Sequence, residues 1–109
     1  MSVELFKYDG NIYDEDAEVI LYKPIATQRI YNKYLEPAIE ELNIRYFYDG
    51  AEIRKNNLDS VMSELELLIK WVTINVEGTY LEYLLPRLED IKEVIPKYLK
   101  NDDDIIYIF

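Results

Sequence analysis

Histidine and cysteine are both absent from this chain of 109 residues. Without histidine, the chain has no Ser-His-Asp or Cys-His catalytic arrangement, and it lacks the commonest general base and metal ligand. Without cysteine, it has no disulfide, no thiolate nucleophile and no zinc site of the usual Cys/His type. These two absences exclude the most frequent hydrolase and zinc chemistries.

Glycine and long apolar runs are also scarce. The three glycines, Gly10, Gly50 and Gly78, do not form a GxGxxG or GxxxxGK phosphate-binding pattern. No run of about 18 apolar residues is present, so we expect no transmembrane helix. The segment MSVELFKYDG does not combine a basic region with a long apolar stretch, so we expect no secretory signal and a cytoplasmic protein.

Basic residues are outnumbered, 12 against 22 acidic ones, which gives a net charge of −10. Direct binding to nucleic acid needs clustered lysine and arginine, so it is disfavoured, as is an anionic membrane surface. The favoured partner is a basic protein surface, and we expect a monomer when it is free. The alternative is that the charge only keeps the protein in solution.

One stretch, residues 57–76, predicts the helix around which the rest of the chain packs. Its apolar residues follow the i, i+3, i+4, i+7 spacing of one helix face: Leu58, Val61, Met62, Leu65, Leu68, Ile69, Val72 and Val76. We expect Asn57 to cap this helix. We expect the opposite side to face solvent, with Asp59, Ser63, Glu64, Glu66 and Lys70.

The remaining segments predict strands and two further helices. The strands are expected at 3–8, 17–23, 44–48, 51–54 and 105–109, with Pro24 ending the second and the last one covered on both faces. The helices are expected from a Thr27 cap to residue 42, with a kink or break near Leu35–Glu36 caused by Pro37, and over 80–100 after a Thr79 cap. Pro86 and Pro96 should bend the second helix or divide it.

Together these elements predict an α+β fold. We expect one small domain over residues 1–109, with an antiparallel or mixed sheet of about four strands packed against three amphipathic helices.

Carboxylates are the only abundant groups with catalytic or metal-binding chemistry. Two runs stand out, at 14–16 and at 102–104, but neither has the D-x-D-x-D-G spacing of a calcium loop. In such an acidic chain these runs are most simply solvated surface. We therefore expect no catalytic residue, no metal and no cofactor. An enzyme that uses carboxylates alone is the remaining enzymatic alternative.

Tyrosine is abundant, with eleven residues. Its large rigid ring and polar tip suit it to protein interfaces, although most tyrosines edge a core. Tyr46 and Tyr48 flank Phe47, which would place both tyrosines on one face of the expected 44–48 strand. The following Asp49-Gly50 turn should bring that strand end to the surface.

In size, charge and aromatic content the chain is similar to bacterial immunity proteins and antitoxins that neutralise nucleases, and to phage inhibitors that imitate the charge of DNA. The likeness has no motif, so no residue role can be carried over. It favours a small acidic inhibitor that occludes the basic active site of a toxin. A structural adaptor or homodimer subunit is the main alternative. The partner-binding residues that we expect are Tyr13, Asp14, Glu15, Asp16, Tyr46, Tyr48, Asp49 and Glu52, and the rival surface is Asp59, Glu64 and Glu66.

Overall fold

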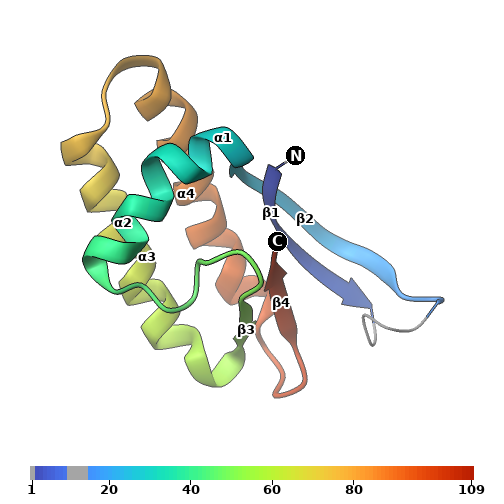
Figure 1. Ribbon diagram of the computed structural model, residues 1–109. Helices are drawn as coiled ribbons and strands as arrows, with labels where there is room; N and C mark the ends of the chain where they lie inside the picture. Colours follow the sequence, from blue (N-terminus) through green and yellow to red (C-terminus); the bar gives the residue numbers. More distant parts are fainter. Residues whose placement is uncertain (1, 10–14) are drawn as a thin grey trace.

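The computed structural model describes residues 2–9 and 15–109 (Figure 1). It confirms the α+β class. Three helical segments pack against a four-stranded antiparallel sheet. The elements in chain order are β1 (Ser2–Asp9), β2 (Glu18–Thr27), α1 (Gln28–Ile30), a π-helical turn (Tyr31–Leu35), α2 (Glu36–Leu42), β3 (Glu52–Arg54), a 3-10 turn (Lys55–Asn57), α3 (Leu58–Asn75), α4 (Gly78–Tyr98) and β4 (Ile105–Ile108).

The strand order is β2-β1-β4-β3, so β4 lies between β1 and β3 and bridges segments that are far apart in the sequence. Leu5 pairs with Ile108, and Phe6 pairs with Tyr107. Glu4 and Phe109 extend this ladder, because each backbone N–H donates to the other residue's carbonyl at 2.9 and 3.0 Å. The strands β2 and β3 form the two edges of the sheet.

The hydrophobic core lies between the sheet and the helices. Side chains alternate along a strand, so each strand sends every second residue inward. The inward residues Val3, Leu5, Ile53, Ile106 and Ile108 are fully buried. The predicted apolar face of α3 is confirmed as core, with Val61, Leu65, Leu68 and Val72 buried, and α4 adds Leu84, Leu88, Ile91 and Ile95.

Figure 1 shows the helices on one side of the sheet. The expectation that the last strand would be covered on both faces is therefore wrong. Ile106 and Ile108 are buried, whereas Ile105 and Tyr107 on the other face of β4 are only half-buried. The aromatic residues on the outward face of this apolar run, Tyr107 and Phe109, pack against rings of β1 instead of being covered by a helix.

The strand predicted at 44–48 is also absent, and the segment is irregular. Three backbone groups of the 44–48 segment form hydrogen bonds with side chains instead of with a neighbouring strand. The Glu64 carboxylate accepts from the N–H groups of Arg45 and Tyr46 at 2.8 and 3.1 Å. The Tyr31 hydroxyl donates to the Phe47 carbonyl at 2.9 Å. Glu64 is consequently only 8 % exposed, so its prediction as a solvent-facing residue of the helix is wrong.

Pro24 does not end the second strand, which continues to Thr27. It lies opposite Glu4, next to a register shift between Val3 and Glu4. A proline is tolerated at such an irregularity in an edge strand, because few ladder bonds there require its missing N–H.

Prolines divide the first of the two predicted helices but not the second. Pro37 follows the π-helical turn and lies in the first turn of α2, so the break near Leu35–Glu36 takes the form of that turn. Pro86 and Pro96 lie within the single helix α4.

Of the three caps expected from the sequence, only one is confirmed. The Thr27 hydroxyl accepts from the Ile30 N–H at 3.4 Å. Asn57 precedes α3, but its side chain accepts from the Arg54 N–H at 3.2 Å and makes no cap bond to the helix. Glu77 occupies the N-cap position of α4, and Thr79 lies inside the first turn.

Candidate functional site

The sheet face that points away from the helices is rich in aromatic rings. Regular alternation places on this side the residues between the buried positions of β1 and β4, together with Tyr22 from the edge strand β2. We call this surface the outer aromatic face, and its members are Phe6, Tyr8, Tyr22, Tyr107 and Phe109. No helix of the described residues covers it (Figure 1).

The rings form one connected cluster. Phe6 lies at its centre, with ring centroids 5.3 Å from both Tyr22 and Phe109 and 6.2 Å from Tyr8. Tyr107 joins Tyr8 and Phe109 at 6.2 and 6.1 Å. These separations lie in the range where aromatic pairs attract beyond simple area burial. The cluster holds its rings in place, yet Tyr22 and Phe109 remain exposed.

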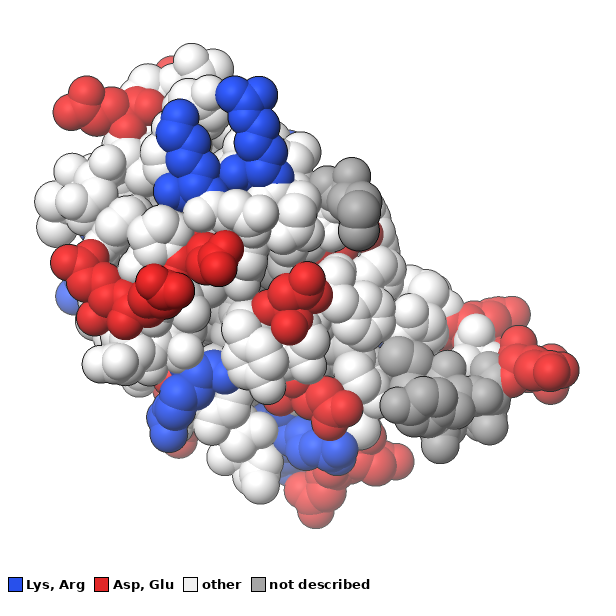
Figure 2. All heavy atoms as spheres, in the orientation of Figure 1, with Lys and Arg blue, Asp and Glu red and all other residues white. Residues whose placement is uncertain are grey.

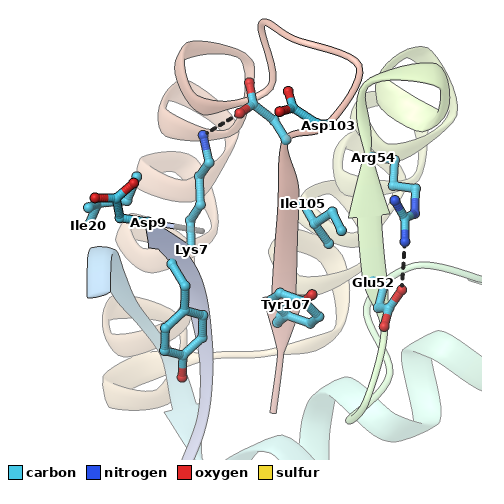
Figure 3. A pocket seen from close by; sticks show the side chains of 10 residues that line it. Lys7, Asp9, Ile20, Glu52, Arg54, Asp103, Ile105 and Tyr107 are labelled. Carbon is cyan, nitrogen blue, oxygen red and sulfur yellow. Dashed lines mark hydrogen bonds and ion pairs between the residues drawn. The ribbon is translucent and has the colours of Figure 1, made fainter. Parts of the chain in front are cut away.

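A depression of about 610 Å³ adjoins this cluster, where β1 and β4 separate. The two strands pair at Phe6 and Tyr107, but β1 runs on to Asp9 while β4 begins at Ile105 without further pairing between them. Tyr8, Ile105 and Tyr107 supply apolar walls, and the charged lining residues are Lys7, Asp9, Glu52, Arg54, Asp103 and Asp104 (Figure 3).

Two ion pairs neutralise part of this charge. The Lys7 ammonium lies 2.7 Å from the Asp104 carboxylate and donates to the Tyr98 carbonyl at 3.0 Å. Arg54 pairs with Glu52 at 3.3 Å (Figure 3). Asp9 and Asp103 have no ion pair within the described residues. The depression therefore has a surplus of negative charge.

Hydrogen bonds shift the pKa of two groups on this side of the sheet. The Lys7 ammonium and the N–H groups of Asn101 and Lys100 lower the pKa of Asp104 to about 2, because all three favour its charged form. A hydrogen bond with the Glu4 carboxylate raises the pKa of the Tyr22 hydroxyl. Tyr22 presents a neutral ring beside a carboxylate, as any tyrosine does at neutral pH.

The predicted partner-binding residues do not form a single surface. Tyr13 and Asp14 lie outside the described residues. Glu15 and Asp16 are exposed at the end of the hairpin formed by β1 and β2, which projects away from the helices (Figure 1). Figure 2 shows acidic side chains at this projecting end and no basic side chain visible there. Glu52 lies on β3 and lines the depression.

Tyr48 and Asp49 line a different hollow, of about 360 Å³, between the 44–50 segment and α2. Glu36 and Glu40 line it as well, and no basic residue does. Tyr31 lies at its base, where burial and the charges of Asp49 and Glu36 raise the pKa of its hydroxyl to about 12.

Tyr46 is half-buried and belongs less clearly to a binding surface. Its hydroxyl accepts from the Asn57 side chain at 3.3 Å, and its ring lies 5.2 Å from the Arg45 guanidinium carbon. In the rival surface, Asp59 and Glu66 are exposed and could contact a partner. Glu64 is buried, so it does not belong to that surface.

Comparisons of the chain with family models, curated proteins and solved structures find no match. Function must therefore be inferred from this chain's own residues. Within the described residues, no group of three or more acidic side chains is placed to hold a metal ion. No helix of that part of the chain is long and apolar enough to cross a bilayer.

Sequence reasoning missed the aromatic members of the outer face. The signal was present, because Phe6 and Tyr8 alternate with Leu5 and Lys7, and Tyr107 and Phe109 alternate with Ile106 and Ile108. Alternation alone does not show which face is covered. That depends on the helices, all of which pack on one side of the sheet.

Proposed function

We propose that this protein is a small acidic inhibitor of the immunity-protein or antitoxin type. It acts in the cytoplasm and neutralises a basic, nuclease-type toxin by occluding its active site. The observation that carries the proposal is the outer aromatic face, an uncovered cluster of rings beside a negatively charged depression, on a chain of net charge −10.

Both parts of this surface suit a basic protein. Aromatic rings that are already held by their neighbours lose little conformational entropy on binding, and they supply the desolvated contacts that dominate interface energies. Carboxylates around them accelerate the approach of a basic surface and discriminate against acidic ones. A nuclease site is basic because it binds phosphate, so an acidic aromatic surface is complementary to it.

The exposed carboxylates at the hairpin end serve the approach step in this proposal. Glu15 and Asp16 project from the body of the protein, and Tyr13 and Asp14 precede them in sequence. Tyr48 and Asp49 provide a second contact region on the other hollow. Contacts with the toxin at both regions would cover more of its surface than either region alone.

The experiment begins with co-purification of partners from the source cell at low and high salt. Any basic partner is then assayed for nuclease activity with increasing amounts of this protein. We expect stoichiometric loss of the activity and binding that weakens with salt. Salt-independent binding, or full nuclease activity in the complex, would contradict the proposal.

Variants separate the approach step from the anchor contacts. Replacing Glu15 and Asp16 with lysine should slow association at low salt, and the matched control replaces the exposed Glu82 and Glu89 of α4 with lysine. Tyr22→Ala should speed dissociation, with Tyr80→Ala on α4 as its control. If the paired variants and controls behave alike, neither region binds the partner.

A structural subunit is the second candidate, because an uncovered apolar sheet face could also pack against a second copy. The two functions differ in what they predict for the free protein. An inhibitor is a monomer alone and binds its target in a salt-dependent manner. A homodimer held by apolar area persists at high salt, which analytical ultracentrifugation at two ionic strengths measures directly.

A further inference from the structure

The edge of the sheet at β2 is open. β2 has ten residues and, among the described residues 2–9 and 15–109, pairs with β1 alone. A strand directs its N–H and C=O groups alternately to its two sides, so half of those in β2 point away from the sheet. Figure 1 shows no helix or strand of the described residues beyond this edge. The large side chains nearest to it, Val19, Ile20 and Tyr22, are 46 to 50 % exposed.

The opposite edge of the sheet is much less accessible to pairing. β3 has only three residues, continues directly into the 3-10 turn and α3, and exposes a charged pair, Glu52 and Arg54. Short length and charged side chains are features by which proteins block an edge. On β2, Pro24 and the adjacent register shift interrupt the part of the strand near the helices, and a second register shift, between Lys7 and Tyr8, leaves Ile20 as an extra residue. Apart from this irregularity, the stretch 18–23 is longer than β3, contains no proline and pairs in regular register at residues 21–23.

We propose that the basic partner inserts an extended segment that pairs with the open edge of β2 at residues 18–23. The added strand would enlarge the sheet by one, and its outward side chains would continue the outer aromatic face beyond Tyr22. This inference rests on the proposed function and specifies its binding mode, which is strand addition supported by side-chain contacts.

The carboxylates near this edge favour binding of a basic segment. Residues 9 and 15–22 include the carboxylates of Asp9, Glu15, Asp16 and Glu18 and no lysine or arginine. Lys23, which follows this stretch, already pairs with Asp90 of α4 at 3.1 Å. A strand that carries lysine or arginine near the hairpin end is therefore attracted. A second copy of this acidic chain would instead bring another ten negative charges to the complex.

The test uses a short peptide of alternating lysine and valine as the probe. Its controls are a copy methylated at every backbone nitrogen, which keeps the charge but cannot donate to a ladder, and a peptide of alternating glutamate and valine. Binding is measured by NMR titration, and amide hydrogen exchange is followed along β2. Because several ladder bonds are lost together, we expect the methylated copy to bind at least about tenfold more weakly.

The expected result is slower exchange at the outward-facing amides between residues 18 and 23 with the lysine–valine peptide alone. Ile20→Lys should weaken this binding, because an edge lysine opposes strand addition, whereas the matched Ile74→Lys on the exposed side of α3 should not. Circular dichroism establishes that both variants are folded.

Several outcomes would overturn the inference. Equal binding of the parent and methylated peptides refutes strand addition but leaves the preference for a basic partner intact. Exchange protection elsewhere than β2, or no binding of the lysine–valine peptide, refutes this edge as the site. Dimers of the free protein with protected β2 amides would show that a second copy occupies the edge. The nuclease-inhibition assay tests the proposed function separately from all of these.

Discussion

Removing the carboxylate of Glu64 should destabilise the protein far more than its position on an amphipathic helix suggests. One oxygen, Oε1, accepts from the N–H groups of both Arg45 and Tyr46, at 2.8 and 3.1 Å. The other, Oε2, accepts from the Arg45 Nε at 3.1 Å. Glu64→Ala therefore leaves two backbone donors of the irregular 44–48 segment without a partner.

Three variants divide this effect into its parts. A hydrogen bond to a charged group is worth about 1.5–3 kcal/mol, and partial access of water to the segment reduces the sum, so we expect about 2–4 kcal/mol for Glu64→Ala. Glu64→Gln can keep both backbone bonds through its amide oxygen and should cost about 1 kcal/mol. Arg45→Ala removes only a largely exposed ion-pair partner, with a side chain 67 % exposed, and should cost less than about 1 kcal/mol.

The assay is urea unfolding followed by circular dichroism, with Glu66→Ala as the matched control. Glu66 lies two residues along the same helix, is exposed and pairs with Lys92 at 3.4 Å, so its loss should cost less than about 0.5 kcal/mol. Equal costs for Glu64→Ala and Glu66→Ala would refute the reasoning. Equal costs for Glu64→Gln and Glu64→Ala would show that the ion pair, and not the two backbone bonds, stabilises the segment.

Three further predictions concern the core, the last strand and pH. Leu65→Ala removes a fully buried side chain and should cost about 2–5 kcal/mol in urea unfolding, whereas the exposed Leu67→Ala should cost much less. Deleting 105–109 removes the strand between β1 and β3 and should abolish the cooperative thermal transition; a melt near the original temperature would show that the strand is peripheral. Asp104→Asn should destabilise the protein at pH 7. Because the pKa of Asp104 falls from 3.8 to about 2 on folding, its contribution is complete above about pH 4 and is lost as the pH falls towards 2. The difference between wild type and Asp104→Asn should therefore shrink over that range, and a constant difference would contradict the assignment.

Local patterns were sufficient to predict the long elements of the fold. The apolar spacing of α3 indicated a helix, since burial of one face determines that spacing. The short apolar runs of β1 and β4 indicated strands, although the run of β4 did not show that the helices cover only one of its faces. Pro24 was misread because its effect depends on β2 being an edge strand. The 44–48 segment looked like a strand, but a glutamate distant in the sequence binds its backbone. Such long-range contacts leave no local signature.

The candidate site was less predictable for the same reason. Glu52 and the acidic hairpin end could be proposed from the sequence as exposed charges. The outer aromatic face combines rings from β1, β2 and β4, and only the strand order brings Phe6 next to Phe109. The pattern of each segment shows which aromatic residues it contributes, but it does not show that these residues meet in one cluster.

The central position of β4 has a consequence for the order of folding. The β1–β2 hairpin and the α3–α4 pair each join neighbouring parts of the chain, so both can form early at small entropic cost. The pairing of Leu5 with Ile108 closes a loop of nearly the whole chain, and β3 joins the sheet only through β4. Closing such a loop is slow. Until that step is complete, the inner faces of β1 and β3 have no common sheet, so the pairing of β4 with both strands controls when the sheet is assembled.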